Sequence, residues 1–314
     1  MTISRRRFVA GSLVAGAMLP GCSLRLPEVT PPETGPGNRF AAMLRQIEGE
    51  ANGTLGVELI NLATGRSVGI NRDRRFGHAS SFKLSLAAKV LQRHASGEDD
   101  ADRLVTWSEA DLLAYAPFTR KRIGTGATIR ELARATQVTS DNTAANLLLR
   151  EIGGPPALTG FWRSIGDEVS RVDRWEPEMN IVPPSEYRDT TTPAAMARTV
   201  AKIVYGDVLP QAERSDLKGW MVETNTGLRR VRAGLPEGWV AGDKTGTSGL
   251  IGTDGNYIDI GFAESPDGLP PILFACYLRA RQADDDMQTR AETALARVGE
   301  VIVRFARDKS GLID

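Results

Sequence analysis

Apolar positions along the chain change their spacing twice, and these changes divide the sequence into predicted helices and strands. Phe40, Met43, Leu44 and Ile47 recur at the spacing of an amphipathic helix, which predicts a first helix over residues 39–51. Alternating apolar and polar residues follow, a pattern typical of a hairpin. Its two strands are predicted over residues 54–60 and 67–70.

Helical spacing dominates the middle of the chain. The predicted helices cover residues 84–93, 129–135, 143–152, 156–165, 193–204 and 211–222. Residues 166–192 are charged, contain prolines and have no periodicity, which predicts a long ordered loop. Strands are predicted again over residues 239–247, 257–263 and 272–278. An amphipathic helix over residues 291–307 closes the chain.

Strand-forming segments at both ends, with a helical block inserted between them, predict an α/β fold of the α+β type. We expect one α/β lobe built from residues 39–76 together with residues 223–314. A helical lobe is predicted over residues 77–222, and it includes the long loop at residues 171–189.

The first 38 residues carry signals for export rather than for folding. A twin-arginine signature, Ser4-Arg5-Arg6-Arg7-Phe8, precedes a short apolar stretch, so residues 1–21 are predicted to be a signal peptide. The following cysteine, Cys22, lies in a Leu-Pro-Gly-Cys sequence that resembles a bacterial lipobox. Residues 22–38 are rich in proline and predict a tether with little that could pack. We expect a protein of the periplasm or cell envelope anchored by lipid at Cys22; the alternative is cleavage nearby and a soluble product.

Composition excludes several classes of function. The 314 residues include 39 basic and 39 acidic ones, so the chain has no basic field for nucleic acid. Removal of residues 1–21 would leave 36 basic against 39 acidic residues, a net charge of −3. Two histidines and two cysteines, Cys22 and Cys276, are too few for a histidine/cysteine zinc cluster. The chain contains no apolar run of the roughly 18 residues that a spanning helix needs.

Three short motifs carry candidate chemistry. In Ser80-Ser81-Phe82-Lys83, which opens a predicted helix, the serine and lysine share a face, so the lysine can help to deprotonate the hydroxyl. Ser140-Asp141-Asn142 precedes another helix, and Lys244-Thr245-Gly246 lies in a predicted strand. Each has a purely structural alternative: a helix cap for the first two and a lysine-protected edge strand for the third. Their joint order, about 60 and 104 residues apart, favours a catalytic interpretation.

With these motifs, the sequence from about residue 39 to its end resembles the class A serine β-lactamases. The segments that carry the resemblance include residues 139–149, 152–155, 173–180 and 188–193. The third holds Glu176 and Asn180, a Glu-x-x-x-Asn element that penicillin-binding proteins lack. The resemblance implies a five-stranded antiparallel sheet flanked by the N- and C-terminal helices, an inserted helical lobe, and an active site between the lobes.

The resemblance also implies a role for each catalytic residue. Ser80 would attack the lactam carbonyl, with Lys83 or Glu176 as the base for acylation, a choice that stays open. Ser140 would relay a proton to the leaving nitrogen, and Glu176 would activate the water that hydrolyses the acyl-enzyme. Arg174 and Asp189 resemble an ion pair that pins the two ends of the long loop.

Substrate binding is likewise implied by the resemblance. The residues expected to contact substrate or the catalytic water are Tyr115, Asn142, Asn180, Arg230, Lys244, Thr245, Gly246 and Thr247. Asn180 would hold the water, and the lysine and its neighbours would bind the substrate carboxylate. For Arg230 an alternative remains, namely that the arginines around it form a solvated strand face.

The sequence therefore predicts a monomeric β-lactam hydrolase with a small-molecule substrate and no nucleic-acid partner. The mechanism that the resemblance implies requires no metal or organic cofactor. We expect hydrolysis of penicillins and cephalosporins. Carbapenem hydrolysis stays open, because Ala79 and Ser248 stand where certain carbapenem-hydrolysing relatives join two cysteines. The alternatives are a peptidoglycan DD-peptidase or transpeptidase, and a penicilloylated sensor lipoprotein without turnover.

Overall fold

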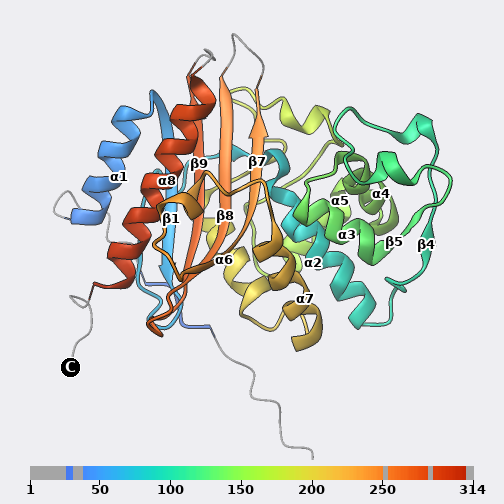
Figure 1. The fold of residues 1–314 in the computed structure, drawn as a ribbon, viewed down its shortest axis with the longest axis horizontal. Helices are drawn as coiled ribbons and strands as arrows, with labels where there is room; N and C mark the ends of the chain where they lie inside the picture. Colours follow the sequence, from blue (N-terminus) through green and yellow to red (C-terminus); the bar gives the residue numbers. More distant parts are fainter. Residues whose placement is uncertain (1–25, 31–37, 250–253, 282–285, 309–314) are drawn as a thin grey trace, which may run out of the picture.

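A computed structural model describes residues 26–30, 38–249, 254–281 and 286–308. Five strands form one antiparallel sheet in the order β2-β1-β9-β8-β7 (Figure 1). Their bounds are Gly53–Asn61 for β1, Ser67–Ile70 for β2, Val240–Ser248 for β7, Gly255–Glu264 for β8 and Ile272–Ala280 for β9. The expected five-stranded antiparallel sheet is thus confirmed.

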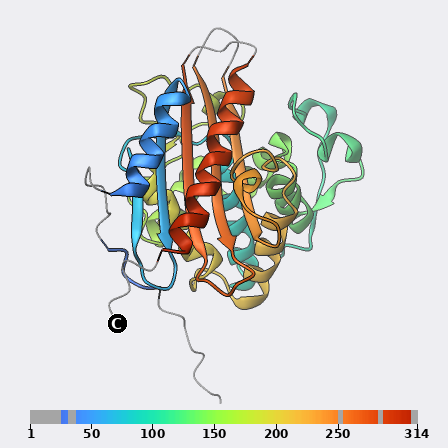
Figure 2. The same ribbon diagram turned by 60° about the vertical axis from the view of Figure 1, so that its left-hand side comes forward.

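The two faces of the sheet are covered by different parts of the chain. Helices α1 (Arg39–Glu50) and α8 (Met287–Ala306) lie side by side across one face (Figures 1 and 2). Side chains alternate along β9, so that Phe274 and Cys276 pack toward these helices while Ala275 and Tyr277 pack toward the other face. Because both faces of β9 are covered, residues 272–278 form a continuous apolar run.

The opposite face of the sheet meets the helical lobe. The helices here are α2 (Phe82–Ala95), α3 (Ile129–Val138), α4 (Asn142–Ile152), α5 (Pro155–Ser164), α6 (Pro193–Val204) and α7 (Gln211–Glu223). Helix α6 packs directly on β1, β8 and β9, whereas α2 to α5 extend away from the sheet (Figure 1). The sequence predicts all six helices, with bounds that agree to within three residues.

Short elements without a periodic pattern are not predicted by the sequence. They include the two-residue strands β3 (Phe76–Gly77), β4 (Leu104–Val105), β5 (Ala127–Thr128) and β6 (Thr190–Thr191). Five 3₁₀ helices complete the described elements: η1 (Ala79–Ser81), η2 (Glu109–Asp111), η3 (Thr119–Arg122), η4 (Glu178–Asn180) and η5 (Val231–Gly234). Three of these, η1, η4 and η5, carry or flank the candidate site.

Residues 26–30 depart from the expectation of a tether that does not pack. Leu26 and Val29 pack against the core, and the backbone amide of Thr30 donates to the carbonyl of Gly65 at 3.0 Å. The hydroxyl of the buried Ser67 donates to the Thr30 carbonyl at 3.3 Å. These five residues, which we call the strap, lie against the β1–β2 turn, at the lower end of the sheet in Figure 1. Two apolar side chains and these hydrogen bonds hold the strap against the folded body.

Among the described residues, no helix is long and apolar enough to cross a membrane. The predicted signal peptide and Cys22 lie outside the described residues.

Candidate active site

Ser80 lies in η1, immediately before α2, at a point where the backbone is strained. The preceding residue, Ala79, has φ +41°, a conformation that residues with a side chain rarely adopt. The helical register then places Lys83 one turn later, and its Nζ donates to Ser80 Oγ at 2.9 Å. The expected contact between this serine and this lysine is therefore present, with the serine in a 3₁₀ turn rather than in the helix itself.

Lys83 is fully buried and is surrounded by acceptors. Its Nζ lies 3.0 Å from the Ser140 carbonyl, 2.5 Å from Asn142 Oδ1 and 3.1 Å from Glu176 Oε1. Burial lowers the pKa of Lys83, and the neighbouring Glu176 carboxylate raises it in part. A lysine with a lowered pKa, within hydrogen-bond distance of a serine hydroxyl, is suited to accept its proton.

The segment Ser140-Asp141-Asn142 divides structural and chemical tasks among its residues. Asp141 is fully buried and caps α4 by accepting from the Ala144 amide at 2.8 Å. This cap holds Ser140 just outside the helix at φ +60°, and it holds Asn142 on the first turn, facing Lys83. The helix-cap interpretation of the motif is correct for Asp141, while its neighbours face the site.

Lys244 approaches the site from β7, the edge strand of the sheet. Its Nζ donates to Ser140 Oγ at 3.1 Å and to its neighbour's carbonyl at 2.8 Å. Burial, followed by repulsion from Lys83, lowers the pKa of Lys244 well below its ordinary value. Gly246 lets β7 come close to the nucleophile, since a Cβ atom there would lie 3.1 Å from the Ser80 amide nitrogen.

Glu176 reaches the site from the long loop between α5 and β6. One carboxylate oxygen, Oε2, accepts from Asn180 Nδ2 at 2.6 Å, and the other forms the ion pair with Lys83. Asn146 on α4 holds the backbone of Glu176 at both ends: its Oδ1 accepts from the Glu176 amide at 3.1 Å, and its Nδ2 donates to the Glu176 carbonyl at 2.8 Å. Glu176 is therefore fixed by contacts from α2, α4 and η4.

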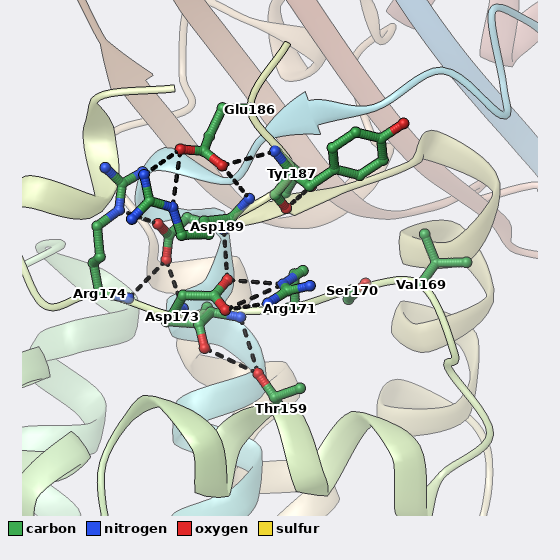
Figure 3. A network of polar contacts seen from close by, with 12 residues as sticks. Thr159, Val169, Ser170, Arg171, Asp173, Arg174, Glu186, Tyr187 and Asp189 are labelled. Atoms are coloured by element: carbon green, nitrogen blue, oxygen red, sulfur yellow. Dashed lines mark hydrogen bonds and ion pairs between the residues drawn. The ribbon is translucent and has the colours of Figure 1, made fainter. Parts of the chain in front are cut away.

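The two ends of the loop are joined by the predicted pair. Arg174 Nε lies 2.6 Å from Asp189 Oδ2, and Asp189 Oδ1 accepts from the amides of Asp173 and Arg174 at 2.7 and 3.0 Å (Figure 3). Asp173 returns the contact by accepting from the Asp189 amide at 3.0 Å, and it also pairs with Arg171 (Figure 3). Asp189 is fully buried. The network joins it to Arg174, two residues before Glu176, and so holds the two ends of the loop together.

A cavity of about 640 Å³ opens over these groups. Of the predicted residues, those that line it are Ser80, Tyr115, Ser140, Asn142, Asn180, Arg230, Thr245, Gly246 and Thr247. Lys83, Glu176 and Lys244 lie behind this lining, almost fully buried. Tyr115 is half exposed at the rim, and its carbonyl accepts from the Asn142 amide at 3.0 Å.

Arg230 does not belong to a solvated strand face. It directly precedes η5 and is 5% exposed, with Nη1 donating to the carbonyls of Gly246 and Ile258 at 2.9 and 2.6 Å. Its Nη2 donates to Thr247 Oγ1 at 2.5 Å. The structure thus buries this arginine beside Gly246 and Thr247 in the wall of the cavity, and the solvated-face interpretation does not fit its burial.

Several residues of the site are not singled out by the sequence. Asn146 lies in the segment 139–149 that carries the resemblance, and its amide in the sequence Asn-Thr-Ala-Ala-Asn is the available signal. Thr226 shares a hydrogen bond with Thr245 through the two hydroxyls at 2.6 Å. Additional residues at the rim are Asn225, Leu228, Arg229, Gln288 and Glu292. No local pattern marks them, because they come from loops and from α8, far from the motifs in sequence.

These contacts define an acyl-transfer site with a serine nucleophile, two buried lysines and a loop-borne carboxylate. Comparisons with known proteins agree with this class. The family described as "Beta-lactamase enzyme family" matches residues 39–306. The chain is 42% identical to beta-lactamase FAR-1 of Nocardia farcinica (strain IFM 10152) over 79% of each chain. It is 38% identical to the carbapenem-hydrolyzing beta-lactamase KPC of Klebsiella oxytoca, over 83% of this chain and 88% of that relative.

Solved structures lead to the same family. An ancestral class A beta-lactamase (GNCA) superposes with a TM-score of 0.81 at 45% sequence identity, covering 85% of this chain and 100% of that one. The chain belongs to the class A β-lactamase family. It is a serine β-lactamase, a hydrolase that opens the β-lactam amide, and the transpeptidase and sensor alternatives are not favoured.

Proposed function

We propose that Ser80 attacks the β-lactam carbonyl after transferring its proton to the cluster formed by Lys83 and Glu176. The support for this step is the 2.9 Å contact between Lys83 Nζ and Ser80 Oγ, together with the lowered pKa of the lysine. The backbone amides of Ser80 and Thr247 would stabilise the oxyanion. Ser140, in contact with Lys244, would deliver the proton to the leaving nitrogen.

Hydrolysis of the acyl-enzyme is assigned to Glu176. The observation that carries the proposal is the position of its carboxylate, with Asn180 on Oε2 and Lys83 on Oε1, in a loop held by Asn146. Lys83 contacts both the Glu176 carboxylate and Ser80 Oγ, so the carboxylate lies close to the nucleophile. The side-chain amide of Asn180, next to the carboxylate, can hold a water. No metal or organic cofactor enters the proposed reaction.

Replacement of Glu176 separates the two half-reactions. Glu176→Gln keeps the shape of the side chain but removes the base, so a penicillin should acylate Ser80 and remain attached. Intact-mass spectrometry should then detect a persistent adduct at one equivalent, while the wild-type protein returns to its free mass. Turnover by the variant at the wild-type rate would contradict the role of Glu176.

The substrate breadth that we propose includes penicillins and cephalosporins. Thr245, Thr247 and Arg230 line the end of the cavity where a substrate carboxylate would bind, and Lys244 lies behind them. Charge-assisted hydrogen bonds to a carboxylate contribute roughly 1.5–3 kcal/mol. Carbapenem turnover has support from the similarity to KPC, whereas the lack of a cysteine pair at Ala79 and Ser248 opposes it. A turnover panel across the three classes tests this breadth.

We also propose that the protein is exported, cleaved before Cys22 and anchored by lipid on that cysteine, as a monomer in the periplasm or cell envelope. The support is the twin-arginine signature and the lipobox-like sequence. The mature protein should partition into detergent and carry acyl mass on an N-terminal cysteine, and Cys22→Ser should move it to the aqueous phase. An aqueous wild-type protein that starts at another residue would contradict the anchor.

A further inference from the structure

Two buried carboxylates lie on the face of the sheet opposite to the nucleophile. On β8, Ile258 and Ile260 pack toward the helical lobe, so Asp259 points to the face that α8 covers. Its partner in the ladder is Thr245 of β7, and Asp243 lies two residues before that threonine on the same face. Both aspartates are 0% exposed, and neither belongs to the reaction as proposed above.

Each of these carboxylates holds the chain next to Arg230. Asp259 Oδ2 accepts from the backbone amide of Val231 at 3.1 Å, and Asp243 Oδ2 pairs with Arg232 Nε at 2.5 Å. Gly227 permits the approach of Asp243, because a Cβ atom at that position would lie 2.4 Å from its carboxylate oxygen. Residues 227–232 are thus fixed to the back of the two strands on both sides of Arg230.

Arg230 itself contacts neutral acceptors only, among the described residues. It donates to two carbonyls and to the Thr247 hydroxyl, and its Nε has no hydrogen-bond partner within the described part of the chain. No carboxylate in this part of the chain therefore neutralises the guanidinium by direct contact, so its charge remains available to the cavity. Its position then depends on the backbone that carries it.

The contact from Asp259 fixes this backbone one residue away. Burial raises the pKa of Asp259 well above its ordinary value. Both the ionised and the protonated carboxyl keep an oxygen that can accept from the Val231 amide, so the contact does not depend on the charge of Asp259. The carbonyl oxygen of Val231 lies against Gly299 of α8, and a Cβ atom at position 299 would come within 2.2 Å of that oxygen. The turn is therefore held between α8 and the aspartate and has little room to shift.

We propose that Asp259 is the positioning residue of Arg230, and that by fixing the Val231 amide from the far face of the sheet it sets the affinity for the carboxylate of the substrate. The inference rests on the proposed role of Arg230 in carboxylate binding. A displacement of about 1 Å at a binding group lowers affinity and rate strongly, even where the group itself is still present.

The test uses two variants of nearly equal size in the full mature chain. Asp259→Val removes the acceptor and suits a buried strand, whereas Asp259→Asn keeps an oxygen that can accept from Val231. Benzylpenicillin is compared with its methyl ester, which lacks the charged carboxylate. We expect Asp259→Val to raise KM for benzylpenicillin about tenfold with kcat within twofold, and to leave KM for the ester unchanged. Asp259→Asn should restore KM for benzylpenicillin.

The control is Glu264→Gln, at the end of the same strand, where Glu264 pairs with Lys218 away from the cavity; it should change the kinetics of neither substrate. Equal losses on benzylpenicillin and the ester, or no loss on either, would overturn the inference. Where Asp259→Val yields no folded protein, Asp259→Ser, whose hydroxyl is too short to reach Val231, gives the same comparison.

Arg230→Ala separates the two proposals. If it lacks the carboxylate-specific effect, the role of Arg230 fails. If only Arg230→Ala has that effect, the role of Asp259 fails.

Discussion

His78 stands two residues before the nucleophile and has a packing role. Its ring stacks on Trp162 with the centroids 5.0 Å apart and the planes 5° from parallel, and it is fully buried. Burial lowers the pKa of His78 to about 4. The ring is therefore neutral in the folded protein at neutral pH, and it supports η1 from behind the site.

This burial couples the stability of the protein to pH. Between the unfolded pKa of 6.5 and the folded pKa of about 4, the unfolded chain binds more protons at this histidine, so stability falls as the pH decreases through that window. The shift corresponds to a loss on the order of 3 kcal/mol. His78→Phe keeps a stacked ring that does not titrate, and urea unfolding should show a shallower loss of stability between pH 7 and pH 4.

Comparing His78→Phe with the wild-type protein cancels the contributions of other groups that titrate between pH 7 and pH 4, because both chains contain them. Burial raises the pKa of Asp243 to about 6, which acts in the opposite direction, but Asp243 is present in both chains. Parallel stability curves for the wild-type protein and His78→Phe would show that His78 does not carry this coupling.

At the scale of elements, the sequence predicts those helices and strands in which several buried apolar residues leave a recognisable pattern. Residues 272–278 form a short, continuous apolar run, which predicts a strand buried on both faces. The strand is observed as Ile272–Ala280, with its side chains divided between two cores. The 3₁₀ turn of Ser80 has only three residues and no period to detect. Resemblance alone places Arg230 at the site, since its burial depends on β7, β8 and α8, which come later in the chain.

The long loop illustrates the other limit of prediction from sequence. Its existence follows from charge and the lack of periodicity, and the pair of Arg174 and Asp189 follows from resemblance. The hold of Asn146 on Glu176 spans 30 residues, and no local pattern specifies it. Asp173, which accepts from the Asp189 amide, lies in a segment that carries the resemblance, but nothing in the sequence indicates its role.

Loss of the loop's closing contacts should affect the second half-reaction first. Asp189→Asn replaces a buried carboxylate that accepts from two amides and pairs with Arg174, so we expect a loss of roughly 1–3 kcal/mol in the free energy of unfolding. Glu176 would be held less firmly, and deacylation should slow more than acylation in stopped-flow measurements.

Arg188→Gln provides the matched control within the same loop. Arg188 pairs with Glu186 at the surface, and exposed ion pairs contribute little. We expect its unfolding and both rate constants to stay near those of the wild-type protein. Slowed acylation with unchanged deacylation in Asp189→Asn would contradict the proposed link between the loop and Glu176.

At the scale of the whole molecule, the strap adds a contact before the first helix. A soluble chain that starts at Leu26 should be more stable than one that starts at Pro31, because Leu26 and Val29 are partly buried and Thr30 bonds to Gly65. Burial of this size contributes roughly 1–2 kcal/mol, or about 2–4 °C in Tm. Steady-state kinetics of the two chains should agree, and identical melting temperatures would contradict a docked strap.

The strap also changes the reach of an anchored enzyme. With lipid on Cys22, a free linker to Asn38 would span 16 residues and allow the folded body to explore roughly 55 Å from the bilayer. Docking from Leu26 leaves four residues, about 14 Å of chain. The lower end of the sheet in Figure 1 would then remain close to the lipid headgroups. Such an enzyme would meet antibiotic by diffusing laterally with its lipid, and it would intercept molecules at the membrane surface rather than across the depth of the envelope.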